Sequence, residues 1–520
     1  MNLNVESMTL KWPLAAVIAA FSMLLLPALT HSILVHPPEY DELLHVLAAR
    51  GLNETGLPSI ADGVYTRAQL YTQLIAWVTA LGDNELVMAR LPALFFGMLT
   101  TAMLTAWVAI RVGWIAALVV AGLFVISPVT LSSSVLVRFY TLHTLLMGAL
   151  LLFWFESSRW SRTSGNIAIF TVFSVLLIWL GLKFHDLTQI TILSGVAALT
   201  MLLFYDNRNA LLSTAKRLPF VCALIFAALV SLIVIIAIQV DILTILRGTA
   251  VPLWSADRSN NYAFYISSLS VGLPFIWPLF PLMIICAFFE NARLALFCLV
   301  AFVVSLMVNS IAAQKATRYF HHAYPMFCII WAIGFQRAFV YGYTELCKIF
   351  GTSSRVALLM LTVLALCFLS SHEVKRGIKM VLDRGKLDDT IAVVSEPDWS
   401  LSLPVIGELA ESVDTLVVTS GVKGQYTFGK FDYEMSTTVV QETETGLDFG
   451  IDPRTNRQVI GQPDSVETVI DADGQALFVL ENRMMNKPFS SPMESVSVLN
   501  QRCESIDLSE TGSQLSAWLC

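Results

Sequence analysis

Repeated apolar stretches of about 20 residues constrain this chain more than any other feature of its sequence. Each is long enough to cross the hydrocarbon core of a bilayer as a helix. The chain is 56% hydrophobic and only 14% charged, whereas soluble domains carry about 25% charged residues. We therefore predict an all-α polytopic membrane domain with about eleven spans, at residues 12–35, 90–110, 113–131, 139–156, 166–183, 187–205, 218–240, 262–289, 294–313, 323–343 and 355–371.

The orientation of the spans is predicted from the positive charges in the loops between them. With the N-terminus in the cytoplasm, every short inside loop carries Arg or Lys, and the outside cations are spread over longer loops. The first span is too long for the apolar core of a signal peptide, so we expect it to be retained. The chain after residue 372 then lies outside. All eight histidines also fall at or near outer ends of spans, which indicates that the chemistry is on that side.

Residues 373–520 differ in composition from the rest of the chain, because they are polar and contain no membrane-length span. Buried strands are expected at 390–395, 415–420 and 475–480, with a helix at 401–413. This order predicts a small α/β domain. It could be a lid, an acceptor-docking surface or a stabilising element. Cys503 and Cys520 could pair there in an oxidising compartment, unless the terminal residue is frayed.

The densest acidic cluster near any span is the stretch 37–50, which reads PPEYDELLHVLAAR. Its two prolines end the first span and start a short surface helix. Carboxylates in a first turn are favoured by the helix dipole, so these acids could simply be helix-start residues. They could also be reactive, since Asp41 and His45 share one helix face. A divalent metal is possible on the donor set Glu39, Asp41, Glu42 and His45.

Cations and imidazoles gather in a second stretch, QKATRYFHHAYP, between two late spans. Two cations and two imidazoles in eight residues predict an anion site, because Arg and Lys match phosphate oxygens. Its candidate binding residues are Lys315, Arg318, Tyr319 and His321.

Two smaller polar groups lie at the outer edges of other spans. Arg138 and Tyr140 precede the fourth span, and Arg138 is either a functional cation or a snorkelling anchor. His185 and Asp186 are either a second polar pair at the site or interfacial residues. A carboxylate near phosphate-binding cations suits a lipid-phosphate sugar, with the carboxylate deprotonating the acceptor and the cations stabilising the leaving phosphate. The net charge of −7 and the lack of a basic tract argue against nucleic acid.

Four stretches together resemble the GT-C glycosyltransferases, especially their protein-mannosyltransferase-like and aminoarabinose-transferase-like members. Asp41-Glu42 resembles the paired acidic motif that follows their first span. The segment 68–99, with GDNELVMARLPALFFGML, is similar to their second surface helix and second span. VRFY at 137–140 and TRYFHHAYP at 317–325 resemble their fourth-span start and late outer-loop motif. The resemblance covers about residues 12–371, and loosely a trailing outer α/β domain.

The resemblance implies an inverting membrane glycosyltransferase that moves a sugar from a polyprenyl phosphate, such as undecaprenyl phosphate, to a hydroxyl of a lipid, glycan or protein. It implies Asp41 as base, Glu42 in support and Arg318 on the donor phosphate. It also implies a GT-C-like domain at 1–372 and an outer domain at 373–520, in a bacterial inner membrane with the site on the periplasmic side. One departure is Thr66-Arg67-Ala68-Gln69, where the family often has a Pro-rich start.

Two other classes of protein remain open from the sequence. A transporter or flippase of a lipid-linked glycan is expected to carry ionisable residues near the bilayer midplane and often inverted repeats. The spans here are nearly free of charge at their centres, and no repeat is visible. A scaffold whose outer domain binds a partner would leave the clusters around Asp41 and Arg318 unexplained.

Overall fold

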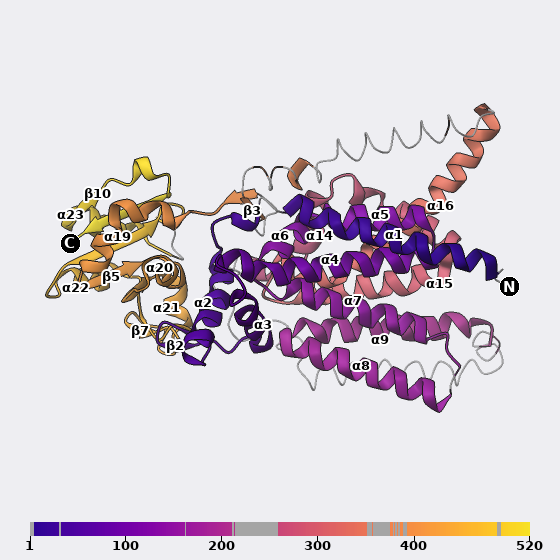
Figure 1. Ribbon diagram of the computed structural model, residues 1–520, viewed down its shortest axis with the longest axis horizontal. Coiled ribbons are helices and arrows are strands. Elements are labelled where there is room, and N and C mark those ends of the chain that lie inside the picture. The colour runs from indigo at the N-terminus through magenta and orange to yellow at the C-terminus, as the bar shows by residue number, and fades with distance from the viewer. Residues whose placement is uncertain are drawn as a thin grey trace.

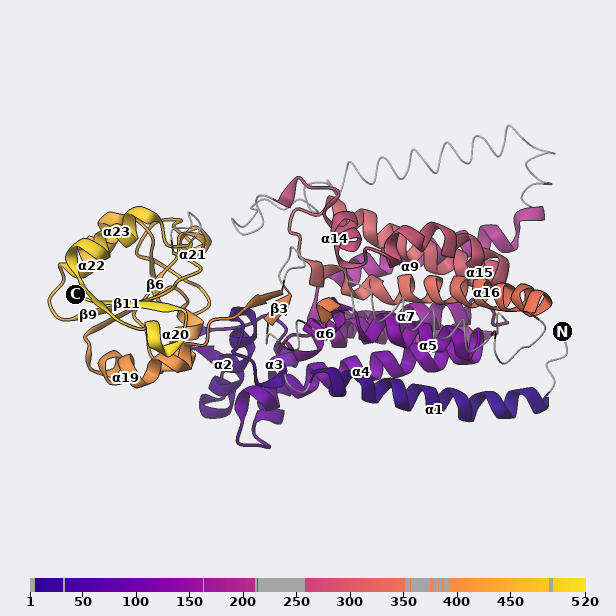
Figure 2. The ribbon, with the colours of Figure 1, turned by 90° about the horizontal axis from the view of Figure 1, so that it is seen from above.

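The molecule consists of a long helical bundle with a sheet-containing region beyond one end (Figure 1). In both views α2 (Tyr40–Thr55) lies between these two parts, and the N-terminus is at the far end of the bundle (Figure 2). Two predicted spans, 218–240 and 355–371, lie outside the described residues, apart from residue 356. The computed structural model describes residues 5–30, 33–161, 163–210, 213, 258–350, 356, 375–377, 379, 382, 385–387, 393–485 and 490–520.

Apolar helices run along the length of the bundle. Within the described residues, six helices are long and apolar enough to cross a membrane, or seven if α5 and α6, bent by 62°, form one broken span. Pro128 begins α6, directly after the break. The chain is an integral membrane protein, but the count of eleven spans stays a prediction. The bundle helices are α1 (Val5–Thr30), α4 (Glu85–Arg111), α5 (Trp114–Val125), α6 (Pro128–Val135), α7 (Tyr140–Ser157), α8 (Ser164–Phe184), α9 (Leu187–Asp206), α14 (Phe264–Gly272), α15 (Ile276–Ile311) and α16 (Tyr324–Phe350).

The longest of these helices, α15, folds back on itself. Asn291 has non-helical backbone angles, and its Oδ1 accepts a hydrogen bond from Leu294 N at 3.2 Å, which caps the second half. The rings of Phe280 and Phe302 are 5.5 Å apart, although a straight helix would separate them by about 33 Å. The two halves therefore run antiparallel, close to the two spans predicted at 262–289 and 294–313.

The first loop forms a compact layer at one end of the bundle. It contains η1 (Ile33–Val35), α2, β1 (Ser59–Ile60), β2 (Gly63–Val64) and α3 (Gln69–Thr79). Helix α2 ends at Gly56, whose φ of 79° suits a residue without a side chain. The buried leucines of α2 pack against Tyr71 and Ile75 of α3, and Val422 from the C-terminal region joins the same cluster. Helix α3 lies at the start of the segment 68–99, where the family resemblance implied a second surface helix.

The C-terminal region is built on a seven-stranded sheet of order β10-β11-β9-β5-β6-β8-β7. Its centre, β9-β5-β6-β8, is parallel, and its remaining pairs are antiparallel. Both faces are covered, since Leu416 and Val418 point into one core and Val417 into another. The strands are β5 (Thr415–Val418), β6 (Tyr433–Met435), β7 (Gly450–Ile451), β8 (Gln458–Ile460), β9 (Ala476–Glu481), β10 (Glu504–Ile506) and β11 (Leu515–Leu519).

The helices of this region cover the sheet and connect its strands. Two of the three predicted strands are β5 and β9, and the predicted helix is α19. The third, predicted at 390–395, is β4 (Val393–Ser395), which pairs instead with β3 (Gly385–Leu387) in a separate ladder. The remaining elements are η3 (Trp399–Ser402), α19 (Leu403–Ser412), α20 (Gly421–Phe428), α21 (Thr437–Glu442), α22 (Pro463–Ile470), α23 (Met493–Arg502) and η4 (Ser509–Thr511).

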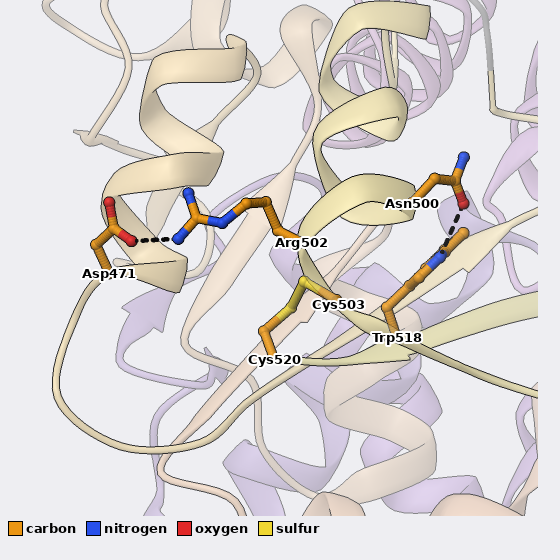
Figure 3. The surroundings of a disulfide bond; sticks show 6 residues. All are labelled: Asp471, Asn500, Arg502, Cys503, Trp518 and Cys520. Carbon is orange, nitrogen blue, oxygen red and sulfur yellow. Dashed lines mark hydrogen bonds and ion pairs between the residues drawn. A yellow bond between two sulfur atoms is a disulfide. The ribbon is translucent and has the colours of Figure 1, made fainter.

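The chain terminus is fixed by a disulfide between Cys503 and Cys520 (Figure 3). Cys503 directly follows α23, and Cys520 follows β11. The backbone of Cys520 is not frayed, because its N–H donates to Ala476 O at 2.9 Å and its carbonyl accepts from Ala476 N at 3.1 Å. The predicted pairing is therefore present.

Candidate active site

Asp41 lies between two arginines that come from distant parts of the chain. Its Oδ1 is 2.5 Å from Arg138 Nη2, and its Oδ2 is 2.9 Å from Arg318 Nη2. Asp41 is in the first turn of α2, Arg138 is in the link between α6 and α7, and Arg318 is in η2 (Thr317–Ala323). The structure thus brings together three residues that the sequence placed on one side of the membrane.

This arrangement keeps the Asp41 carboxyl ionised. Burial alone would raise its pKa, but the guanidinium charges of Arg138 and Arg318 outweigh burial and hold the pKa well below its usual range. Both arginines still carry an unused donor, because the buried Nε atoms of Arg138 and Arg318 have no hydrogen-bond partner among the described residues. Such unused donors are costly unless a ligand or water meets them.

These residues line a cavity of about 710 Å³ between the bundle and the sheet. We call the part lined by Tyr40, Asp41, Tyr65, Arg67, Arg138, Arg318 and Tyr319 the bundle half. We call the part lined by Ser420, Lys423, Glu434, Glu442, Arg454, Glu481 and Arg483 the sheet half. The cavity is large enough for a sugar phosphate, and both halves are rich in charged side chains.

Glu42, the second predicted catalytic residue, is turned away from this cavity and is 1% exposed. Its Oε1 accepts hydrogen bonds from Arg90 Nε at 2.9 Å and Val137 N at 3.0 Å. Its Oε2 accepts from Arg90 Nη2 at 2.7 Å and Glu39 N at 2.9 Å. Glu42 therefore fixes the start of α2 against α4 and against the residue that precedes Arg138. It thus holds the turn of α2 that carries Asp41 and does not face the cavity.

Arg90 is a residue that the sequence analysis missed. It lies within the apolar helix α4 and is 2% exposed. Besides Glu42, its Nη1 donates to the carbonyls of Leu34 at 2.8 Å and His36 at 2.9 Å. The sequence could have indicated this role, because a cation within an apolar span requires a partner of opposite charge or a polar partner.

Three predicted residues pack around Arg138 and Tyr319. His45 Nδ1 is 3.0 Å from Thr72 Oγ1, and its Nε2 is 3.5 Å from Arg138 Nη1. The rings of Tyr140 and His185 lie 6.3 Å and 5.8 Å from the ring of Tyr319. Of this group Tyr319 lines the cavity, and His45, Tyr140 and His185 form an aromatic wall behind it.

Three other predicted residues lie away from the cavity. Lys315 Nζ donates to the carbonyls of Ser259 at 2.8 Å and Ala312 at 2.5 Å. His321 is held between two threonine hydroxyls, each 3.2 Å from a ring nitrogen. Asp186 is exposed at the start of α9. The cationic stretch therefore does not act as one site, because Gln314, Arg318 and Tyr319 line the cavity whereas Lys315 and His321 do not.

The donor set predicted as a possible metal site does not fit a metal. Both oxygens of Asp41 face guanidinium groups, and all of the hydrogen bonds to Glu42 come from Arg90 or backbone N–H groups. His45 is fully buried. In the described part of the chain, no group of three or more His, Cys, Asp or Glu side chains could hold a metal ion.

The sheet half was not predicted as part of the site. Its residues follow the carboxyl ends of strands that the sequence did predict: Ser420 follows β5, and Glu481 ends β9. Ligands of α/β proteins bind at the carboxyl edge of the sheet. The position of these residues just after predicted strands could therefore have indicated a binding site. The pKa of Glu434 is raised to about 8, mainly by burial and further by the nearby Asp452 carboxylate.

The helical membrane bundle carries an acidic helix in its first loop, and the sheet region packs against that helix. Two solved structures are similar to the chain in fold. ArnT from Cupriavidus metallidurans, bound to undecaprenyl phosphate, matches with a TM-score of 0.59 and 12% identity over 97% of both chains. The oligosaccharyltransferase AglB from Archaeoglobus fulgidus, in complex with an inhibitory peptide and a dolichol-phosphate, matches with a TM-score of 0.55 and 12% identity over 90% of this chain and 69% of its own.

The predicted resemblance to GT-C glycosyltransferases is therefore confirmed at the level of the fold. No protein-family model matches the sequence, and no curated protein matches it.

Proposed function

We propose that this protein transfers a sugar from a polyprenyl phosphate to a hydroxyl group of an acceptor. The observation that carries the proposal is Asp41, held between Arg138 and Arg318 in a cavity at one end of a membrane bundle. The two similar structures hold undecaprenyl phosphate and a dolichol-phosphate, which supports a lipid-phosphate donor here. The acceptor is a lipid, glycan or protein.

The proposed reaction is a single displacement. Asp41 accepts the proton of the acceptor hydroxyl, whose oxygen forms a bond to the anomeric carbon from the face opposite the phosphate. The bond between that carbon and the phosphate oxygen breaks, and the phosphate leaves with the electron pair. Arg138 and Arg318 stabilise its charge. The configuration at the anomeric carbon is inverted.

Donor binding would also make Asp41 a stronger base. In the present structure both guanidinium groups hold the pKa of Asp41 low. A donor phosphate between Arg138 and Arg318 would accept hydrogen bonds from the same groups and add negative charge, so the pKa of Asp41 would rise. Proton transfer would then be favoured only when the donor is bound.

We place this site on the periplasmic side of a bacterial inner membrane, with residues 1–372 as the membrane domain and 373–520 as an outer domain. The Cys503–Cys520 disulfide supports this placement, since disulfides persist in oxidising compartments. So do the cations at the other end of the bundle, where Arg111 pairs with Glu156 and Arg293 with Asp206. Positive charges are enriched on the cytoplasmic side.

The placement predicts the behaviour of reporter fusions. Alkaline phosphatase fused after Cys520 is expected to be active, because this enzyme folds only in an oxidising compartment. The matched control is a fusion truncated after Arg111, at the other end of the bundle, which is expected to be inactive. An inactive fusion after Cys520 with an active one after Arg111 would reverse the orientation.

The transfer itself can be tested with purified protein in detergent and a panel of undecaprenyl-phosphate sugars. Acceptor-dependent release of undecaprenyl phosphate is expected. A transporter or flippase needs two compartments and would release none in detergent, so the assay separates the two classes of protein.

Replacing Arg318 by alanine is expected to weaken donor use about tenfold to over a hundredfold. The loss of a charge-assisted contact to phosphate costs about 1.5–3 kcal/mol. Binding of undecaprenyl phosphate and the transfer rate would measure it, with thermal unfolding as the check on folding. Arg337→Ala, at the far end of the bundle and 46% exposed, is the matched control. Normal kinetics in Arg318→Ala would make Arg318 an interface anchor.

A further inference from the structure

The cavity contains two buried hydroxyl groups that the proposed chemistry does not use. Tyr40 Oη and Ser420 Oγ both line it, and neither has a hydrogen-bond partner among the described residues. Ser420 is 6% exposed. An unpartnered buried hydroxyl costs free energy that a ligand can recover. Unlike the Nε atoms of Arg138 and Arg318, these two groups are uncharged and can both donate and accept, which suits a sugar hydroxyl better than a phosphate.

The two hydroxyls are connected through the sheet half of the cavity. The Arg454 guanidinium lies over the Tyr40 ring, 5.8 Å from its centre. The Glu434 carboxylate, which also lines the cavity, accepts a hydrogen bond from Gly421 N at 2.9 Å, next to Ser420. Glu434 and Arg454 are close enough for their charges to interact. Tyr40 and Ser420 therefore flank one continuous polar surface.

The sheet topology puts this surface at a position where α/β proteins bind ligands. After β5 the chain adds β6 and then β8 on one side, and it returns to add β9 on the other side. The order of strands thus reverses between β5 and β9. Ser420 follows the carboxyl end of β5, and ligands bind in the crevice at such a reversal.

The charges of the sheet half disfavour an anion. Its cations are already neutralised: Lys423 contacts Glu396 at 3.0 Å and Glu481 at 2.7 Å, and Arg483 contacts the same two carboxylates at 2.7 Å and 2.8 Å. Arg454 contacts Asp452 at 2.9 Å and Glu442 at 3.1 Å. An anion here would meet the carboxylates of Glu442 and Glu481, which line the cavity, and those of Glu396 and Asp452 lie behind the same cations.

We propose that the sheet half, together with Tyr40, is a sugar subsite that takes a hydroxyl-rich ring without negative charge and rejects carboxylated sugars. The inference rests on the proposed function, which assigns the phosphate to the bundle half. The sugar is either that of the lipid donor or that of a glycan acceptor, because both carry the same hydroxyl chemistry.

The test uses two variants that each remove one of these hydroxyls, Tyr40→Phe and Ser420→Ala. Two matched controls remove hydroxyls that are also buried and unpartnered but do not line the cavity, Tyr71→Phe and Ser491→Ala. All four variants are expected to fold, because none of these hydroxyls has a partner to lose. Binding to full-length protein is measured for undecaprenyl phosphate, undecaprenyl-phosphate glucose, undecaprenyl-phosphate glucuronate, free maltotriose and free trigalacturonate.

If the subsite holds the donor sugar, the glucose lipid is expected to bind better than the glucuronate lipid, and Tyr40→Phe and Ser420→Ala each weaken the glucose lipid about two- to tenfold and leave undecaprenyl phosphate unchanged. If it holds the acceptor sugar, the two variants weaken only maltotriose, which is expected to bind better than trigalacturonate. In either case, equal binding of the neutral and the carboxylated sugar overturns the charge selectivity, and cavity variants that behave as the controls do overturn the subsite. Failure of undecaprenyl phosphate to bind at all would instead refute the proposed function.

Discussion

Replacing Asp41 by asparagine is expected to lower the rate of sugar transfer by about 10²- to 10⁴-fold, because asparagine cannot accept the proton of the acceptor hydroxyl. The protein should stay folded, since asparagine has the same shape and is tolerated at the start of a helix about as well as aspartate. Some stability is lost, because the Arg138 side chain, 4% exposed, loses its charged partner. The matched control is Asp464→Asn, which changes a carboxylate in the first turn of α22, outside the cavity, and should be silent.

The same substitution should not weaken donor binding. In the parent protein Asp41 occupies one Nη2 donor of Arg138 and one of Arg318, so a phosphate competes with it. Loss of the carboxylate charge should leave the affinity for undecaprenyl phosphate unchanged or higher. A rate close to that of the parent would mean that Asp41 is not the base, even if the protein is a glycosyltransferase.

The sequence could predict that Asp41, Arg138 and Arg318 lie close together, because it predicted the side of the membrane on which each residue lies. Asp41, Arg138 and Arg318 are far apart in the chain, but each follows or precedes a span at the same membrane face. Residues at one face of a bundle have few places to lie, so their meeting was expected. The strands β5 and β9 were equally readable, because buried parallel strands are continuous apolar runs.

The directions in which individual side chains point could not be predicted from the sequence. Lys315 and Arg318 are three residues apart, yet Lys315 turns to backbone carbonyls and Arg318 to Asp41. The local backbone decides this difference: Arg318 is within the 3₁₀ turn η2, and Lys315 precedes it. The sequence also did not show that the sheet region packs against α2. Contacts such as that of Arg454 with the Tyr40 ring depend on how two distant parts of the chain pack together.

The second large effect is expected on stability, at the pair Glu42 and Arg90. Both side chains are almost completely buried, at 1% and 2% exposed. Removing one partner of such a pair leaves an uncompensated charge and typically costs about 3–5 kcal/mol. Glu42→Gln and Arg90→Met should therefore each lower the thermal midpoint of the purified protein strongly. The control is Arg50→Met, which breaks a pair with Glu85 that is 34% and 28% exposed and should cost much less.

A double substitution distinguishes a structural role of Glu42 from a direct role in the reaction. When Glu42→Gln and Arg90→Met are combined, neither charge is left alone, so the loss of stability should be smaller than the sum of the single losses. Transfer per folded molecule should recover in parallel, because Glu42 acts on Asp41 through the position of α2. If Glu42→Gln were instead stable but inactive, and Arg90→Met did not change its activity, Glu42 would take part in the reaction itself.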